Sequence, residues 1–170
     1  LEAVSRFVQG RLVPAHEDTK LDVGPMLCYE ALARAAGQNV TASDIESELA
    51  TVGEIGAVAE RLDLGGQRDL SAFGDAEEDP LSIAEVEATL RSIATASGGG
   101  STDTKRDTLF GLFNRAEPLE ARYLARLVLG EMRIGVGQGA VRDAIAEAFA
   151  VPPDAVERAL QVSNDCGFVA

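Results

Sequence analysis

Apolar residues recur at spacings of three and four along nearly the whole chain, and this spacing constrains the fold more than any other feature. The alternation of β-branched residues that is typical of strands is absent. Alanine, the best helix former, occurs 27 times among 170 residues. The sequence therefore predicts an all-α fold, a compact multi-helix domain of about ten helices with no sheet.

Local signals place several helix boundaries. Pro25 and Pro118 have the position expected for the first residue of a helix. Thr41 with Asp44, and Ser82 with Glu85, are typical of helix caps. Ser101 or Thr102 is expected to cap the helix that follows a run of three glycines. The stretch 64–80, rich in Gly, Asp and Ser, is predicted to be an exposed loop and an internal boundary.

Two pairs of segments match at nearly one offset. Leu21-Asp-Val-Gly24 aligns with Ile134-Gly-Val-Gly137 at an offset of 113, and the segments 54–59 and 165–170 align at an offset of 111. Chance similarity is the alternative in an alanine-rich chain. Two ordered matches favour two similar helical halves, which we expect to be related by a pseudo-twofold axis.

The charge of the chain is strongly acidic and uneven. The formal net charge is −13, and only two of the 15 basic residues are lysines. This composition is typical of proteins adapted to high salt, although an ordinary acidic cytosolic domain is the alternative. Residues 101–142 carry seven basic and five acidic residues, a net charge of +2, whereas the rest of the chain carries −15. We therefore expect this segment to repel a polyanion less than the rest of the chain does.

Several classes of protein are disfavoured. No run of about 18 apolar residues exists, so we expect no transmembrane helix and no membrane partner. Two cysteines without a CxxC pair or several histidines argue against a disulfide framework or a metal site, and they fit a reducing cytosol. No catalytic set of acids, bases or nucleophiles is recognisable, and no catalytic residue is assigned.

Two glycine-rich segments precede predicted helices. Arg133-Ile-Gly-Val-Gly-Gln-Gly139 places three glycines at alternate positions, and Gly98-Gly-Gly-Ser-Thr-Asp-Thr-Lys105 combines glycines with hydroxyls and a lysine. Unpaired N–H groups at a helix start attract phosphate, and glycine lets a ligand approach the backbone. The alternatives are an ordinary helix connection for the first segment and a flexible linker with a helix cap for the second.

Three longer stretches make a family resemblance specific. The stretches 105–113, 120–137 and 140–146 resemble the N-terminal DNA-binding domain of ATP-dependent DNA ligases of the archaeal and eukaryotic type. Gly53-Glu-Ile-Gly-Ala-Val-Ala-Glu60 and Gly100-Ser-Thr102 are similar to further segments of that family. The resemblance extends from about Arg11 to Ala170, and the acidic, lysine-poor composition suggests a halophilic archaeal member.

The resemblance implies that residues 1–170 form a single helical domain of a longer ligase that seals nicks in replication, repair and recombination. This domain would bind nicked double-stranded DNA in the minor groove without sequence specificity. The nucleotidyltransferase and OB-fold domains would lie beyond residue 170, as would the sites for ATP and Mg²⁺, so the fragment alone would not be catalytic. A cytoplasmic monomer is expected.

The expected DNA contacts fall in two groups with Arg133 and Lys105 as their basic members; the full set is Arg133, Gly135, Gly137, Gln138, Gly100, Ser101, Thr102, Lys105, Lys20 and Gly24. One alternative function remains from the residues. In a helical protein–protein module, Arg122 and Arg126, which lie four residues apart on one helix face, would contact an acidic partner. A small helical enzyme is a weaker alternative because acid/base and metal residues are missing.

Overall fold

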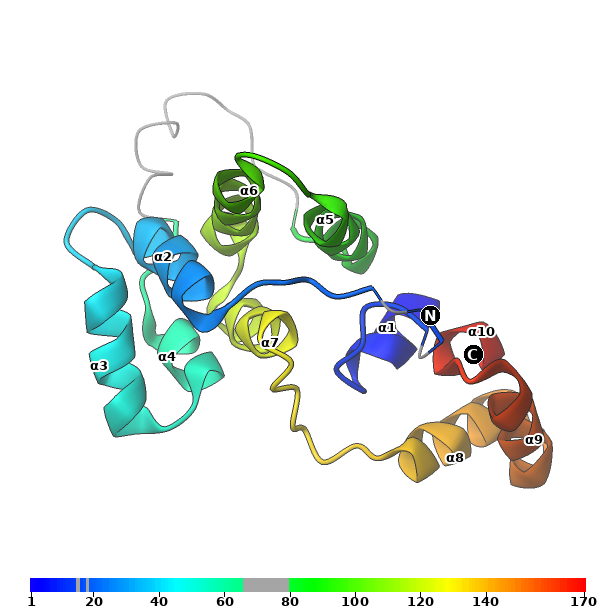
Figure 1. Cartoon of the computed structure of the whole chain (residues 1–170). Helices are drawn as coiled ribbons and strands as arrows, with labels where there is room; N and C mark the ends of the chain where they lie inside the picture. The colour runs from blue at the N-terminus through cyan, green and yellow to red at the C-terminus, as the bar shows by residue number, and fades with distance from the viewer. Residues whose placement is uncertain (15, 18, 66–79) are drawn as a thin grey trace. The chain divides into compact units, whose positions relative to one another are not determined.

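A computed structural model describes residues 1–14, 16–17, 19–65 and 80–170, and these contain ten α-helices and no strand (Figure 1). The prediction of an all-α fold with about ten helices is confirmed. The loop expected at 64–80 lies almost wholly outside the described residues. Internal contacts divide the chain into two units, which we call unit 1 (residues 1–20 and 130–170) and unit 2 (residues 21–129).

Unit 2 contains six helices. They are α2 (Pro25–Ala36), α3 (Ala42–Val52), α4 (Ile55–Arg61), α5 (Ile83–Thr95), α6 (Ser101–Arg115) and α7 (Pro118–Val128). Helix α2 packs on α6, and α4 packs on α7. The largest fully buried side chains come from five of these helices; they are Phe113, Leu32, Ile45, Ile55, Leu90, Ile93, Leu109 and Val58. Removing such side chains from water stabilises the fold by about 1.5–3 kcal/mol each.

Unit 1 contains both ends of the chain. Its helices are α1 (Glu2–Phe7), α8 (Gln138–Ala148), α9 (Pro153–Ser163) and α10 (Cys166–Val169). Helix α1 packs on α10, and α9 packs on both α8 and α10. A small core joins α8, α9 and α10; it consists of Val141, Ile145, Ala146, Val156, Leu160 and Cys166.

Most of the predicted boundaries are confirmed. Pro25 and Pro118 occupy the first positions of α2 and α7. The Thr41 hydroxyl accepts from the N–H of Asp44 at the start of α3, and Ser82 caps α5. The predicted cap of α6 is wrong. Gly100 is the cap residue at a φ of 85°, a left-handed conformation that favours glycine, so Ser101 and the residue after it already lie inside the helix.

The two repeats predicted from the sequence have the same helix order. Helices α2, α3 and α4 begin at residues 25, 42 and 55, and α8, α9 and α10 begin at 138, 153 and 166. The cap residues Gly24 (φ −78°, ψ 163°) and Gly137 (φ −81°, ψ 168°) have nearly the same backbone conformation. Gly53 and Asn164, which end α3 and α9, are both left-handed. The pseudo-twofold relation stays a prediction.

The last helix of the second repeat begins with a buried ion pair. The Asp165 carboxylate accepts hydrogen bonds from the N–H groups of Gly167 (3.0 Å) and Phe168 (3.2 Å) at the start of α10. The same carboxylate accepts from Arg6 of α1, at 2.9 Å from Nε and 2.7 Å from Nη2. A Cβ on Gly167 would lie 2.5 Å from Arg6 Nε. The guanidinium therefore occupies the space that a side chain at this position would need.

The corresponding helix of the first repeat begins in the same way. The Glu54 carboxylate accepts from the N–H groups of Gly56 (2.6 Å) and Ala57 (3.0 Å) and from Arg126 Nε of α7 (2.7 Å). A Cβ on Gly56 would lie 2.9 Å from Arg126 Nε and 2.8 Å from the backbone oxygen of Arg122. We call each arrangement an acid–glycine–arginine clasp: Asp165, Gly167 and Arg6 in unit 1, and Glu54, Gly56 and Arg126 in unit 2.

In each clasp, the helix that precedes one repeat packs on the last helix of the other repeat. Arg6 and Arg126 each begin an Arg-x-Val-x-Gly sequence, and the glycines that end these sequences, Gly10 and Gly130, have φ values of 70° and 69°. Helix α1 precedes the first repeat in sequence but packs on α10 of the second, whereas α7 precedes the second repeat but packs on α4 of the first. Each unit is therefore completed by a helix from the other repeat.

The clasps leave no room for a methyl group, so Gly56→Ala and Gly167→Ala should each lower the free energy of unfolding by about 1–3 kcal/mol through overpacking. The effect should be larger at Gly56, where backbone is among the crowding atoms. Gly111→Ala is the matched control, because no atom lies within 4 Å of an added Cβ in α6, and it should stabilise by about 0.5–1 kcal/mol. Urea unfolding measures the free energy of unfolding of all three variants. An increase in all three would contradict the crowding at Gly56 and Gly167.

Acid should weaken the unit 1 clasp. The hydrogen bond from Arg6 holds the pKa of Asp165 below its ordinary value. Because the folded-state pKa is lowered, its contribution to stability is complete above the unfolded pKa of about 4 and is lost as the pH falls through the folded pKa. Asp165→Asn removes the buried carboxylate that pairs with Arg6 and leaves the exposed Glu2, at 3.4 Å, as its remaining printed ion-pair partner, so it should cost about 3–5 kcal/mol near neutral pH. Urea unfolding of both proteins over a pH series should show this difference narrowing below about pH 4; a constant difference would contradict the assignment.

Candidate nucleic-acid interface

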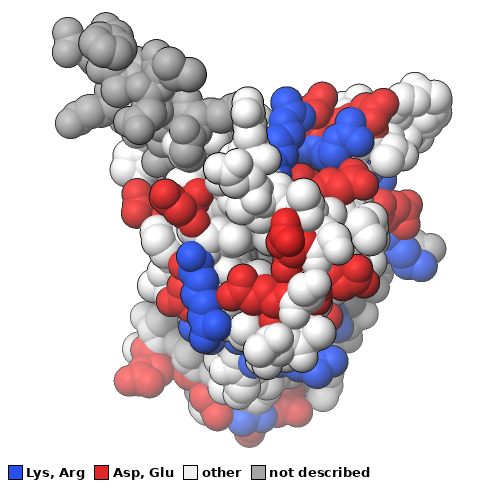
Figure 2. Space-filling view, turned by 90° about the vertical axis from the view of Figure 1, so that its left-hand side faces the viewer, with Lys and Arg blue, Asp and Glu red and all other residues white. Residues whose placement is uncertain are grey.

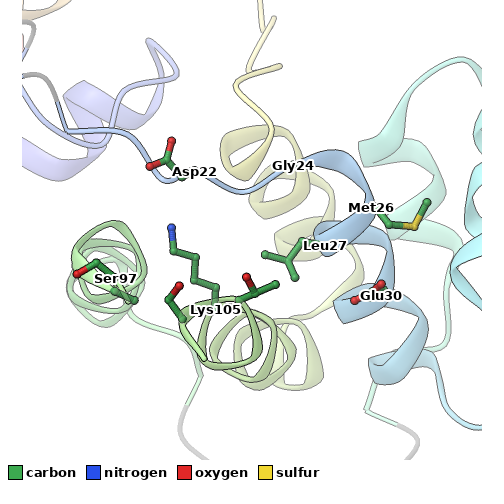
Figure 3. Close-up of a pocket in the computed structure, with 10 residues that line it drawn as sticks. Asp22, Gly24, Met26, Leu27, Glu30, Ser97 and Lys105 are labelled. Carbon is green, nitrogen blue, oxygen red and sulfur yellow. The ribbon is translucent and has the colours of Figure 1, made fainter. Parts of the chain in front are cut away.

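One cleft in unit 2 brings together four of the residues predicted as DNA contacts. It has a volume of about 630 Å³ and lies where the start of α2, the start of α6 and the end of α5 meet (Figure 3). Gly24, Ser101, Thr102 and Lys105 line it, together with Asp22, Met26, Leu27, Glu30, Ala96 and Ser97. Gly100 caps α6 directly beside Ser101. Sequence analysis therefore selected residues that are close in space although Gly24 is about 80 positions from the other three.

Lys105 has an internal partner in this cleft. Its side chain rises from α6 toward the extended segment that carries Asp22 (Figure 3), and its ammonium donates to the backbone oxygen of Leu21 at 2.9 Å. The residue is only 7% exposed. Lys105 thus fixes the segment that leads into α2, and its charge lies beneath the surface of the cleft.

Three helices of the described part begin at a glycine without any capping side chain. They are α2 at Gly24, α6 at Gly100 and α8 at Gly137. The N–H groups in the first turn of such a helix carry a partial positive charge and have no partner within the helix. No atom lies within 4 Å of a Cβ built on any of the three glycines. The backbone at these helix starts is therefore accessible from outside the fold.

Gly24 and Gly137 differ from the clasp glycines in their surroundings. Their extended conformations are open to any residue, and a Cβ at either position would meet nothing in the chain. Neither conformation nor internal packing requires glycine there. Glycine at these two equivalent positions leaves each helix start open to the close approach of an external group.

The remaining predicted contacts lie in unit 1. Arg133, Gly135, Gly137 and Gln138 belong to the segment that leads into α8. Gln138 lines a second cleft, of about 340 Å³ between α8 and α9, together with Gly139, Arg142, Glu157, Leu160, Gln161 and Asn164. Lys20 is exposed and is the last residue of the N-terminal part of unit 1. Each unit thus holds one group of candidate residues.

The arginines of the basic segment 101–142 are mostly paired with acidic residues of the same chain. Arg122 donates to Glu60 at 2.7 Å, and Arg126 donates to Glu54. The ring of Tyr123 lies beside Arg126 at 5.8 Å from its guanidinium carbon. The two arginines proposed to contact an acidic partner protein therefore have acidic partners in their own unit, Glu60 of α4 and Glu54, which caps α4, and this weakens the alternative that depended on them.

The same pairing extends to further arginines. Ion pairs join Arg106 to Asp103 and Glu30, Arg115 to Glu85, Arg142 to Asp143 and Glu157, and Arg34 to Asp107. On the face seen in Figure 2, basic and acidic side chains are interleaved. Sequence counting identified an excess of basic residues in 101–142 but could not show that folding neutralises most of them.

The described residues hold neither a membrane-spanning helix nor a cluster of metal ligands. None of the helices there is long and apolar enough to cross a membrane. In the same ranges, no three His, Cys, Asp or Glu side chains are grouped so that they could hold a metal ion. Both cysteines are buried and unbridged.

Comparison with known proteins identifies the family. The model of the family described as "DNA ligase N terminus" matches residues 1–146. A DNA ligase of Natronomonas pharaonis is 68% identical over 171 residues, which cover 100% of this chain and 31% of that protein. A DNA ligase of Halobacterium salinarum is 64% identical, covering 98% of this chain and 30% of that protein.

A more distant relative shows the same coverage. A DNA ligase of Archaeoglobus fulgidus is 44% identical and covers 96% of this chain and 28% of its own length. The chain spans less than a third of the length of these relatives. The resemblance to ligases of halophilic archaea, found from the motifs and the acidic composition, is confirmed. The chain belongs to the family of DNA ligase N-terminal domains.

Proposed function

We propose that this chain is the DNA-binding domain of an ATP-dependent DNA ligase and contacts the phosphate backbone and minor groove of duplex DNA around a nick. The observation that carries this proposal is the set of three glycine-capped helix starts, whose first-turn N–H groups have neither a capping side chain nor an atom covering the glycine. Such helix starts bind phosphate. Membership of the family supports the phosphates of DNA as their ligand.

These contacts account for binding without sequence preference. Backbone N–H groups and arginine bind phosphate oxygens, which are the same at every base pair. Arg133 would place its planar guanidinium on a phosphate or in the minor groove, while Gly135, Gly137 and Gln138 present backbone at the start of α8. In unit 2, Gly24, Gly100, Ser101 and Thr102 would form the second contact, held in place by Lys105.

The chemistry of sealing would belong to the rest of the parent protein. Among the described residues, Lys105 is bonded to Leu21, and no three His, Cys, Asp or Glu side chains are grouped so that they could hold a metal ion. We propose that nucleotidyltransferase and OB-fold domains of the same polypeptide supply both sites. The domain would act with them as a cytoplasmic monomer in replication, repair and recombination.

Arg133→Ala should weaken binding to nicked duplex about equally for unrelated sequences and should reduce the magnitude of the salt slope by about 1, because one phosphate contact is lost. Gly137→Val should weaken binding more, because its side chain would cover the N–H groups at the start of α8. Fluorescence anisotropy over a series of salt concentrations measures both.

Circular dichroism should confirm that both variants fold, since the conformation of Gly137 suits valine and no neighbour would be displaced. Arg61→Ala, which removes a largely exposed arginine paired with Glu48, is the control for loss of one charge. Unchanged affinity and slope in folded Arg133→Ala and Gly137→Val proteins would remove this segment from the DNA interface.

Lys105→Met tests whether this lysine positions the backbone or contacts DNA itself. Methionine keeps the buried stem but loses the bond to Leu21, so amide hydrogen exchange in residues 21–28 should accelerate. Stability should fall by about 1.5–3 kcal/mol, the usual value for a hydrogen bond to a charged group. A direct contact predicts the opposite pattern: unchanged exchange, and a salt slope reduced by about 1.

A further inference from the structure

The unpaired arginines of the described part are confined to one unit. Every arginine described in unit 2 forms an ion pair with an acidic side chain; these are Arg34, Arg61, Arg91, Arg106, Arg115, Arg122 and Arg126. In unit 1, Arg6 and Arg142 are paired. Arg11, Arg133 and Arg158 have no carboxylate within 4.0 Å among the described residues, nor any other bonded side-chain partner.

This separation is informative because acidic side chains are abundant. The chain has 28 Asp and Glu residues and 15 Lys and Arg residues, so acidic side chains that could pair with an arginine outnumber the basic ones. An arginine that finds no partner under these conditions keeps its full charge and all five N–H donors for an external anion.

Two of these three arginines come from adjacent backbone segments. Gly10 lies so close to the segment 131–134 that a Cβ on it would be 3.1 Å from Met132 Cβ. Arg11 directly follows Gly10, and Arg133 directly follows Met132, so the two arginines start from neighbouring points of unit 1. Arg11 and Arg133 are both exposed. Their side chains extend from two backbone segments that are far apart in the sequence.

We infer that Arg11 and Arg133 together form a phosphate clamp on unit 1 that neutralises neighbouring phosphates of one DNA strand. This inference rests on the proposed DNA-binding function and adds to it Arg11, a residue that no sequence motif singled out. It also assigns the salt-dependent part of the binding energy to unit 1, because the arginines described in unit 2 are already neutralised by their own acids.

The test is the salt dependence of nicked-duplex affinity for the whole 170-residue chain and five variants. Arg11→Ala and Arg133→Ala should each reduce the magnitude of the slope of log K against log salt by about 1, and the double variant by about 2. Arg158→Ala and Arg61→Ala are matched controls, each with the same loss of one positive charge, and should keep the original slope. Circular dichroism confirms folding throughout.

The outcomes distinguish failure of the proposed function from failure of the clamp. If the unaltered chain fails to bind nicked duplex, both the proposed function and the clamp are wrong. If it binds and Arg133→Ala lowers the slope but Arg11→Ala does not, the function stands and the clamp is wrong. If Arg158→Ala lowers the slope as much as Arg11→Ala, affinity follows net charge and the clamp is again wrong.

Discussion

In each unit, an arginine guanidinium packs against a glycine at the start of a helix. This contact determines which helices of the unit pack together. In unit 1 the clasp joins Arg6 of α1 to Asp165, and its side chains are almost completely buried. An unpaired buried charge costs several kcal/mol, so neither partner can be buried without the other. Only a glycine two residues after the acid leaves space for the arginine. The clasp therefore fixes which helix packs on α10, and its counterpart built on Glu54 does the same for α4.

This mode of assembly has a consequence for the surface. The arginine of each clasp points inward and has its charge neutralised, and the other arginines described in unit 2 are paired with acidic residues nearer the surface. An acidic coat then remains around both units, and binding of DNA cannot depend on a broad basic face. The proposed interface depends instead on a few bare helix starts and on unpaired arginines, each of which acts over a short distance.

Much of the fold was predictable from local sequence preferences, whereas contacts between residues far apart in the sequence were not. Pro25 and Thr41 mark helix starts through backbone and cap preferences that a sequence displays directly. The repeats were found because Gly24 and Gly137 lie in similar segments. The pairing of Arg126 with Glu54 was missed because 72 residues separate them and nothing local links them. For the same reason the sequence could not distinguish Arg11, which has no acidic partner in the described part of the chain, from arginines that have one.

The remaining difficulty is how a chain of net charge −13 could bind a polyanion, and the range of the forces resolves it. At about 1 M salt the Debye length is about 3 Å, so repulsion between the acidic coat and DNA is screened beyond direct contact. Hydrogen bonds from backbone N–H groups to phosphate act at about 3 Å and are screened far less. Under such conditions an acidic domain needs only short-range donors, and helix starts without side chains provide them. Lowering the salt would restore the repulsion, while the attraction of a few unpaired arginines would also strengthen. The balance of these two terms, rather than net charge alone, sets the salt range in which the proposed binding is strongest.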